Sequence, residues 1–265
     1  NASNMTNGNK VLQEGDMLLL VDQKDRRYLL TLEANSEFHS HSGYISHDDL
    51  IGKEDGMMIK SSGGLEYLAL RPTMSDVILK MPRSAQIIYP KDIGPILVAA
   101  DIANGDKVLE SGVGSGALSI ALLRAGANVT GIELREDFAQ RARKNVEAFF
   151  SGQKISERYE ILIGDAYNQL NGSDYDRIIL DLPEPWRVID HVENTLRPGG
   201  ILVSYSPSIM QVSRLTDRLK EDNFAMIKTH EILSRSWHVD GRAVRPDHRM
   251  VAHTGFITST RYLGK

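Results

Sequence analysis

The apolar positions in the first part of the chain fall into short runs that are separated by turn residues. Five such runs lie before Pro72, at residues 17–21, 28–32, 43–45, 57–59 and 65–70. Runs of this length, bounded by Gly, Asp and Ser, are typical of strands. Nothing in this region has the length and the 3.6-residue period of a good helix. The pattern therefore predicts a small β-rich domain.

Beyond Pro72 the pattern changes to an alternation of strands and helices. Strand-like apolar runs occur at 107–110, 128–132, 161–163, 177–180, 201–205 and 225–233. Helical spacing is found at 117–124, at Phe138, Ala142, Val146 and Phe149, and at Val212, Leu215 and Leu219. Such short apolar runs suit central strands that are buried on both faces. The last segment, 251–263, has no helix after it, and we expect it to pair antiparallel at a sheet edge.

This alternation predicts the α/β class, with a doubly wound and mainly parallel sheet. We expect a small β-rich domain over residues 5–70 and the α/β domain over residues 71–265.

Composition and charge narrow the possible classes of function. The 265 residues, 41% hydrophobic and 25% charged, are enough to bury a core without disulfides. The chain has no Cys, which excludes thiolate metal sites and cysteine nucleophiles and fits a reducing compartment such as the cytoplasm. With 31 Lys and Arg against 35 Asp and Glu, a polyanionic partner needs a local basic patch. No early apolar run approaches the roughly 20 residues of a membrane span, so we expect no membrane association.

A glycine-rich loop joins the strand predicted at 107–110 to the helix predicted from Ala117. Its glycines are Gly112, Gly114 and Gly116, with Glu110 before them. Glycines at such a junction allow a tight turn and let backbone N–H groups approach a ligand at the helix N-terminus. Ala117 stands where the dinucleotide fingerprint has its last glycine, a replacement which that fingerprint tolerates. The loop predicts a nucleotide-like ligand; a purely structural turn is the alternative.

Acidic residues end the next two predicted strands. Glu133 ends the strand at 128–132, where a carboxylate can accept hydrogen bonds from both hydroxyls of a ribose. Asp165 follows the strand at 161–163, within reach of an adenine amino group. Each has a plainer interpretation, as a helix-capping Glu and a turn Asp. With the glycine loop they predict a ligand that contains adenosine, without showing whether it carries a pyrophosphate.

The strand at 177–180 is followed by Asp181-Leu182-Pro183-Glu184-Pro185-Trp186. This places a carboxylate, two stiffening prolines and an aromatic ring beside the predicted crevice. A turn-capping Asp with a core Trp is the alternative. Together with the glycine loop, the motif makes the chain resemble class I S-adenosylmethionine-dependent methyltransferases. It resembles most fully the tRNA (adenine-N1)-methyltransferase family, which modifies the T-loop adenine of tRNA. Residues 39–43, 51–53, 81–92 and 245–256 also resemble that family.

The resemblance implies a seven-stranded Rossmann-like methyltransferase domain, S-adenosylmethionine as cofactor, tRNA as partner and a homotetrameric assembly. The reaction it implies is methyl transfer to N1 of adenine 58, with adenine 57 left open as a second substrate. The implied cofactor-binding residues are Gln86, Glu110, Gly112, Gly114, Ser115, Gly116, Ala117, Glu133, Asp165, Ala166 and Asp181. The implied catalytic residues are Asp181, which would face the adenine 6-amino group, and Tyr89 and Tyr205, which would hold the base.

The segment 234–249 is basic within an acidic chain. Four arginines, Arg235, Arg242, Arg245 and Arg249, outnumber Asp240 and Asp247, which gives a local charge of 4 − 2 = +2. Trp237 adds a surface on which a base can stack. We expect these arginines and Trp237 to bind RNA, with Arg83 extending the basic surface. A solvated loop whose arginines pair with surface acids is the alternative.

Three histidines, His39, His41 and His47, invite a metal interpretation, because residues i and i+2 of a strand share a face. No carboxylate completes a convincing ligand set, and methyl transfer needs no metal. We expect no metal site.

Three other functions remain open. The region from Pro90 to Gly116 also suits a class I methyltransferase that acts on a small molecule such as a corrin precursor. A non-catalytic tRNA-binding subunit would keep the same fold. An NAD-dependent oxidoreductase is permitted by the glycine loop, but no catalytic Tyr-Lys or His-Asp pair is identifiable.

Overall fold

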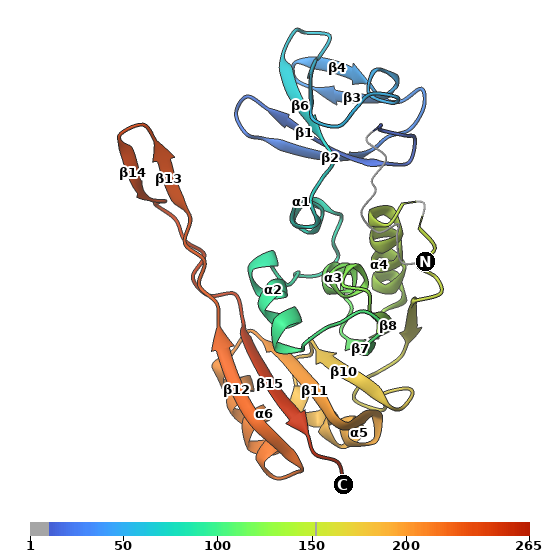
Figure 1. Ribbon diagram of the computed structural model, residues 1–265, viewed down its shortest axis with the longest axis vertical. Coiled ribbons are helices and arrows are strands. Elements are labelled where there is room, and N and C mark those ends of the chain that lie inside the picture. The colour runs from blue at the N-terminus through green and yellow to red at the C-terminus, as the bar shows by residue number, and fades with distance from the viewer. Residues whose placement is uncertain (1–10, 152) are drawn as a thin grey trace. The chain divides into compact units, whose positions relative to one another are not determined.

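The computed structural model describes residues 11–151 and 153–265, and the chain divides into two compact units (Figure 1). Among the described residues, the first unit ends at Pro82 and also takes in residues 147–151 and 153; the second comprises Arg83–Val146 and Lys154–Lys265. The first unit extends past residue 70 because helix α1 (Met74–Lys80) packs against a strand of the small domain. The sequence signal for this unpredicted helix is a capping box between Thr73 and Asp76.

The first unit is β-rich, as the short apolar runs predict. Its antiparallel sheet has the order β2-β1-β6-β5, and a separate hairpin joins β3 to β4. The bounds are β1 Met17–Asp22, β2 Arg27–Thr31, β3 Glu37–Ser40, β4 Gly43–Ser46, β5 Met57–Lys60 and β6 Glu66–Leu70, with a 3-10 helix at His47–Asp49. Alternate residues of β1 and β6, among them Leu18, Leu20 and Tyr67, are fully buried in its core.

The second unit is built on a seven-stranded sheet of order β12-β15-β11-β10-β7-β8-β9, which confirms the predicted doubly wound α/β class. Strands β9, β8, β7, β10 and β11 are parallel neighbours. The strands are β7 Lys107–Ser111, β8 Asn128–Glu133, β9 Tyr159–Ile163, β10 Tyr175–Leu180, β11 Leu196–Ser206, β12 Phe224–Glu231 and β15 Phe256–Tyr262. The helices are α2 Pro90–Ala99, α3 Ala117–Arg124, α4 Glu136–Phe149, α5 Ile189–Thr195 and α6 Ile209–Lys220, with a 3-10 turn at Pro185–Val188.

The prediction that the last segment pairs antiparallel is confirmed, but its expected position at the edge of the sheet is wrong. Strand β15 pairs antiparallel with both β11 and β12, so β12 is the edge and β15 lies inside the sheet. The physical reason is burial: Ile257, Thr258 and Tyr262 of β15 are almost fully covered. By contrast, the last four residues of β12 are all polar and exposed, as suits an edge strand.

The alternation of side chains along β10 decides which residues can meet. Ile178 and Leu180 pack against the core formed by α5 and α6. Arg177 points to the other face, where its guanidinium donates to the carbonyl of Ala100 at the end of α2. Residues an even number of positions away share that face. Asp181 therefore extends the line of β10 on the α2 side of the sheet.

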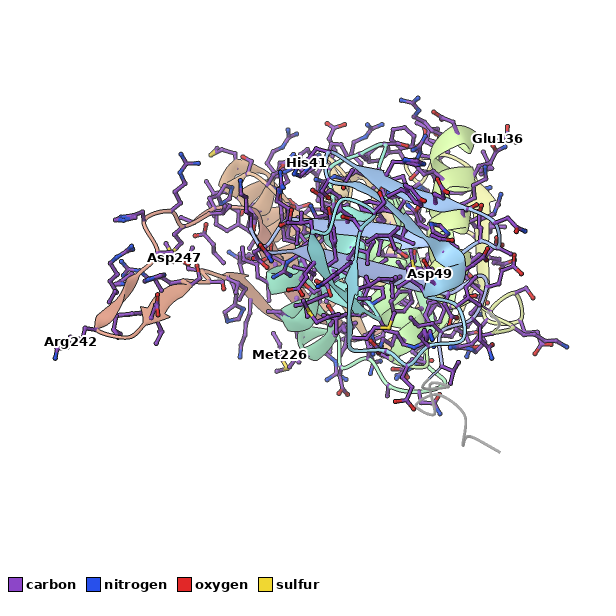
Figure 2. All side chains as sticks on the ribbon, turned by 90° about the horizontal axis from the view of Figure 1, so that it is seen from above. His41, Asp49, Glu136, Met226, Arg242 and Asp247 are labelled. Carbon is purple, nitrogen blue, oxygen red and sulfur yellow. The ribbon has the colours of Figure 1, made fainter. Side chains whose placement is uncertain are left out.

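A two-stranded hairpin leaves the sheet between β12 and β15 (Figure 1). It pairs β13 (Trp237–Asp240) with β14 (Ala243–Pro246), and Figure 2 shows Arg242 at its outer end. We call residues 232–252 the arm. The basic segment 234–249 thus contains a hairpin, for which the sequence analysis gave no prediction. Its signal in the sequence is Gly241 between Val239 and Val244, because glycine at the first position of a two-residue hairpin turn supplies the positive φ that the turn needs.

Candidate active site

A cavity of about 540 Å³ opens at the carboxyl ends of the parallel strands in the second unit. Its walls come from the glycine loop, the end of β8, the turn after β9 and the segment after β10. They are Ala85, Gln86, Ser111, Gly112, Gly114, Ile132, Glu133, Leu134, Phe138, Gly164, Asp165, Ala166, Tyr167, Asp181, Leu182, Pro183, Pro207 and Gln211. Ligands of open α/β sheets bind at this end of the strands.

The glycine loop is pressed against its neighbours so closely that side chains are excluded. A Cβ on Gly112 would lie 2.1 Å from the carbonyl oxygen of Asp181, and Gly112 has a φ of 86°. Gly116, with a φ of 91°, precedes helix α3 and faces Val146 and Ala142 of α4. The loop therefore needs glycine both for its backbone conformation and for its contacts.

Glu133 fastens the glycine loop to the end of β8. One carboxylate oxygen accepts a hydrogen bond of 3.0 Å from the backbone N–H of Gly114. The other accepts a hydrogen bond of 3.2 Å from the backbone N–H of Arg135. Each oxygen keeps a further lone pair for a ligand hydroxyl. The side chain thus shapes the loop and also lines the cavity.

Three carboxyl groups, of Glu110, Glu133 and Asp181, influence one another at this site. Burial, with a smaller contribution from Glu133, raises the pKa of Asp181 to about 7. Burial also raises the pKa of Glu110 to about 8, and both neighbouring carboxyl groups add to the shift. None of the three forms an ion pair with a Lys or Arg side chain among residues 11–151 and 153–265. Such a site favours a ligand that carries positive charge.

Glu110 is held in place by a short chain of hydroxyl groups. Ser119 of α3 donates a hydrogen bond of 2.6 Å to Glu110, and Tyr159 of β9 donates one of 3.0 Å to Ser119. Ser111, the next residue of β7, borders the cavity with a buried hydroxyl that has no partner in the described part of the chain. A buried unpaired hydroxyl beside a cavity fits a polar ligand.

The predicted cofactor-binding residues lie in three places. Gln86, Gly112, Gly114, Glu133, Asp165, Ala166 and Asp181 line the main cavity. Glu110, Ser115 and Ala117 line a neighbouring hollow of about 20 Å³, which Gln86 and Asp181 also border. Gly116 belongs to neither hollow and packs against α4. Asp165 has both predicted features, since it borders the cavity and accepts a turn hydrogen bond from the backbone N–H of Tyr167.

The two tyrosines expected to hold the base do not line either hollow. Tyr89 is half-buried and precedes helix α2. Tyr205 of β11 is buried, and its hydroxyl donates to the carboxylate of Asp92 at 3.0 Å. This bond fixes Tyr205 to α2 on the same face of the sheet as Asp181. A role of either ring towards a base stays a prediction.

Several lining residues escaped the sequence analysis. The spacing of Phe138 and Ala142 places them on one face of a helix, but α4 buries Ala139 and Ala142, while Phe138 is half-exposed and reaches the cavity. Gln211 was missed although Ser208 and Gln211 form a capping box at the start of α6, a pattern that the sequence shows. Its amide also donates to the carbonyl of Pro183 at 2.8 Å. Leu134, Tyr167 and Pro207 carried no recognisable signal.

The arm presents the predicted RNA-binding residues to solvent. Arg235, Arg242, Arg245 and Arg249 are exposed, and none forms an ion pair within the described ranges. The ring of Trp237 is 57% exposed. The alternative in which these arginines neutralise surface acids is therefore not what the structure has. Arg83, before α2, is likewise exposed.

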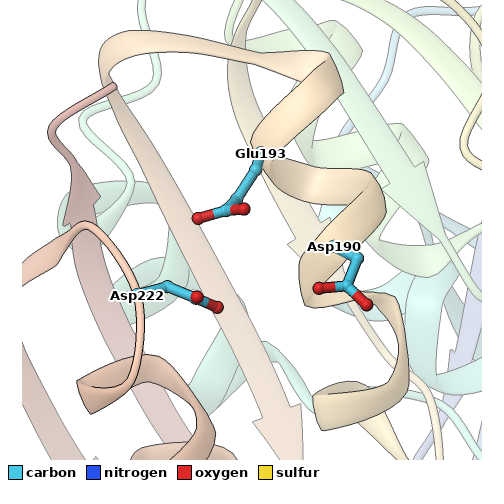
Figure 3. Close-up of side chains that lie close together, drawn as sticks. All are labelled: Asp190, Glu193 and Asp222. Atoms are coloured by element: carbon cyan, nitrogen blue, oxygen red, sulfur yellow. The ribbon is translucent and has the colours of Figure 1, made fainter. Parts of the chain in front are cut away.

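One group of carboxylates stands apart from the cavity. Asp190, Glu193 and Asp222 offer oxygens within 4.8 Å of one another (Figure 3). Arg218 already pairs with Asp190 at 2.6 Å and also with Asp222. The guanidinium of Arg218 thus already pairs with two of the three carboxylates.

The three histidines considered for a metal have other partners. His47 accepts from the backbone N–H of Glu33, His39 lies 3.0 Å from Glu37, and His41 contacts Arg26. Among the described residues no helix is long and apolar enough to cross a membrane.

Comparison with known proteins agrees with this geometry. A family model for the tRNA methyltransferase complex GCD14 subunit matches residues 66–254, and one for a TrmI-like N-terminal region matches residues 11–59. A Methanocaldococcus jannaschii relative, tRNA (adenine(57)-N(1)/adenine(58)-N(1))-methyltransferase TrmI, is 37% identical over 92% of this chain and 94% of its own. The Thermus thermophilus tRNA (adenine(58)-N(1))-methyltransferase TrmI is 34% identical over 92% of this chain and 96% of its own.

Solved structures share the fold of this chain. A SAM-dependent O-methyltransferase from Thermotoga maritima has a TM-score of 0.90 at 32% identity and covers 97% of this chain and 96% of its own. The tRNA (m1A58) methyltransferase TrmI from Aquifex aeolicus has a TM-score of 0.80 at 27% identity and covers 96% of this chain and all of its own. The domain of a precorrin methyltransferase from Rhodobacter capsulatus, at 18% identity over 69% of this chain and 94% of its own, shares the fold alone, with a TM-score of 0.54. This chain belongs to the tRNA methyltransferase family that includes the GCD14 subunit and TrmI.

Proposed function

We propose that the protein transfers a methyl group from S-adenosylmethionine to N1 of adenine 58 in the T-loop of tRNA. The observation that carries the proposal is the half-buried carboxyl group of Asp181, which borders the cavity beside the glycine loop. The matched family and the two TrmI relatives support the substrate.

The residues of the cavity fit the cofactor in charge and in shape. When bound, S-adenosylmethionine supplies an electrophilic methyl group on a positively charged sulfonium. Glu133 and the ionised form of Asp181 give the site the negative charge that a cation needs. Glu133 has lone pairs left for ribose hydroxyls, and Ile132, Leu134 and Ala166 offer apolar surface to a flat ring. The bare backbone of Gly112 and Gly114 allows close approach of the ligand.

The proposed role of Asp181 is electrostatic. Adenine N1 has its own lone pair, so no base is needed to create the nucleophile. As the new N–C bond forms, the ring gains positive charge, and a carboxylate near the 6-amino group stabilises it. Preorganised contacts of this kind are worth about 10²- to 10³-fold in rate. The remaining rate enhancement comes from holding the two reactants in line.

The arm supplies a surface for the phosphate backbone of tRNA. Its exposed arginines and Trp237 combine charge with a stacking surface, as nucleic-acid-binding proteins do. A small substrate such as a corrin precursor gives no reason for such an arm. A non-catalytic role is also disfavoured, because the carboxyl groups of the cavity are in place.

We also propose that the chain forms a homotetramer in the cytoplasm. A hairpin of two strands is marginally stable on its own in water, yet Val239 and Val244 of the arm are 72% and 58% exposed. Contact with a second copy would cover them. Native mass spectrometry tests the assembly: tetramers support the proposal, and monomers at micromolar concentration contradict it.

Cell fractionation tests the compartment.

A methyl-transfer assay tests the function. The protein is incubated with labelled S-adenosylmethionine and an unmodified tRNA transcript, and the nucleosides are analysed. We expect 1-methyladenosine with the wild-type adenine at position 58 and a large loss when it is replaced by guanosine. Label that survives this replacement and disappears only when adenine 57 is also replaced would show that both adenines are substrates. Absence of 1-methyladenosine would overturn the proposal.

A further inference from the structure

His253 lies where the arm returns to the sheet, and both of its ring nitrogens are engaged. Nδ1 is 2.8 Å from a carboxylate oxygen of Glu231 at the end of β12. Nε2 is 2.7 Å from the backbone carbonyl oxygen of Pro207, a residue that borders the cavity. One imidazole thus joins the two ends of the arm to the cavity wall.

The chemistry of the two partners defines the charge of the ring. A backbone carbonyl can only accept a hydrogen bond, and an ionised carboxylate also only accepts. Both ring nitrogens must then carry a proton, which makes His253 an imidazolium. A neutral ring can keep only one of the two bonds.

The residues next to His253 also bond the base of the arm to the second unit. Thr254 donates a hydrogen bond of 2.6 Å to a carboxylate oxygen of Asp92. The same oxygen accepts the hydrogen bond from Tyr205. Gly255 lies against the ring of Tyr205, since a Cβ there would be 2.3 Å from it. On the outgoing side of the arm, Lys91 donates to the carbonyl of Ile232 at 2.6 Å. The base of the arm is therefore bonded to the elements that carry Asp92 and Tyr205.

The groups around His253 act on its protonation in opposite directions. The bonds to Glu231 and to the Pro207 carbonyl raise the pKa of His253 above its ordinary value of 6.5. The positive charge of Lys91 on α2 lowers the pKa of His253, but less strongly. The ring of Phe256, 5.0 Å away, adds no charge. The imidazolium form of His253 is thus favoured over that of an ordinary histidine.

We propose that His253, as an imidazolium, is a positioning residue that fixes the base of the RNA-binding arm to the Pro207 wall of the cavity and so aligns bound tRNA with the reacting site. This inference rests on the proposed function. It requires that deprotonation of His253 weaken the use of tRNA and leave cofactor binding intact, because no bond of His253 reaches the glycine loop or the carboxyl cluster.

The test compares wild type with three variants. H253Q keeps a polar side chain that cannot be charged, E231Q removes the charge that favours the imidazolium, and H230Q replaces an exposed histidine on β12 as a matched control. For each, kcat/KM for tRNA is measured between pH 6 and 9, with the affinity for S-adenosylhomocysteine and the melting temperature. The ring of His253 is titrated by NMR and assigned from its loss in H253Q.

We expect wild type and H230Q to lose kcat/KM for tRNA as pH rises through the His253 transition. E231Q should lower the pH at which kcat/KM for tRNA falls by about one unit. H253Q should not show this fall of kcat/KM with pH, and its kcat/KM at pH 6.5 should be about tenfold below wild type. Its affinity for S-adenosylhomocysteine should stay within about twofold of wild type. A merely structural role would lower the melting temperature without shifting this fall in E231Q.

The failures of the two proposals can be told apart. A His253 ring that is neutral at pH 6, or an H253Q variant with wild-type kcat/KM and an unchanged fall of kcat/KM with pH, overturns the positioning role while tRNA methylation stands. Wild-type protein that methylates no tRNA overturns both proposals, although the NMR titration still reports the charge of the ring.

Discussion

The carbonyl oxygen of Asp181 occupies the space that a side chain on Gly112 would fill. The separation from an ideal Cβ would be only 2.1 Å, and the oxygen belongs to the backbone, so it cannot rotate away as a flexible side chain could. The glycine loop and the residue proposed to act on the adenine are therefore positioned by one contact between the residues that follow β7 and β10. A change at Gly112 has to displace either the cofactor loop or Asp181.

We expect Gly112→Ala to weaken S-adenosylhomocysteine binding by at least about tenfold and to lower the free energy of unfolding by about 2–4 kcal/mol, since it adds a clash to a left-handed backbone. Calorimetric titration measures the binding, and chemical denaturation measures the free energy of unfolding. Gly105→Ala is the matched control, because Gly105 has a φ of 88° but nothing within 4 Å of its Cβ position. It should cost about 1 kcal/mol and leave binding intact. Equal binding losses in the two variants would show that the contact with Asp181 is unimportant.

Binding of the cationic cofactor should depend on the protonation of Asp181. Its pKa is raised to about 7 by burial and by Glu133, and a positively charged ligand favours the ionised form. Affinity for S-adenosylmethionine should therefore rise as pH increases from 6 to 8. Affinity for S-adenosylhomocysteine should change less with pH, because its sulfur carries no charge. Asp181→Asn should flatten the pH dependence and lower kcat by about 10²- to 10³-fold; full turnover by a folded variant would end the proposed role.

The carboxyl group of Glu110 should make the cofactor-free protein less stable at high pH. Its pKa is about 8 when folded, against an ordinary value of 4.5, so between these values the folded state holds a proton that the unfolded state lacks. The free energy of unfolding then falls as pH rises through this range. Glu110→Gln keeps an acceptor for Ser119 and should raise the melting temperature at pH 9 but scarcely at pH 5. The exposed Glu157→Gln is the control, and an equal gain at both pH values would contradict the pKa shift.

Sequence periodicity predicted the parallel strands because short apolar runs are typical of a sheet buried on both faces. The tips of these strands placed Glu133, Asp165 and Asp181 around one cavity, since parallel strands end on the same side. Periodicity could not place β15, because strand order depends on burial by distant elements. It also gave no hint that Pro207 and Tyr167 reach the cavity, which depends on how two turns fold back.

The arm should make tRNA binding strongly dependent on salt. Arg235, Arg242, Arg245 and Arg249 are exposed, and each phosphate contact adds roughly 0.7–0.9 to the slope of log affinity against log salt. Changing all four to Gln should reduce that slope by about 3 and weaken binding at low salt by at least about tenfold, with S-adenosylhomocysteine affinity unchanged. Fluorescence anisotropy with labelled tRNA measures the slope. The control changes Arg141 and Lys144, two exposed cations of α4, to Gln. If that pair reduces the slope as much per residue as the four arginines do, the arm has no special part in binding phosphate.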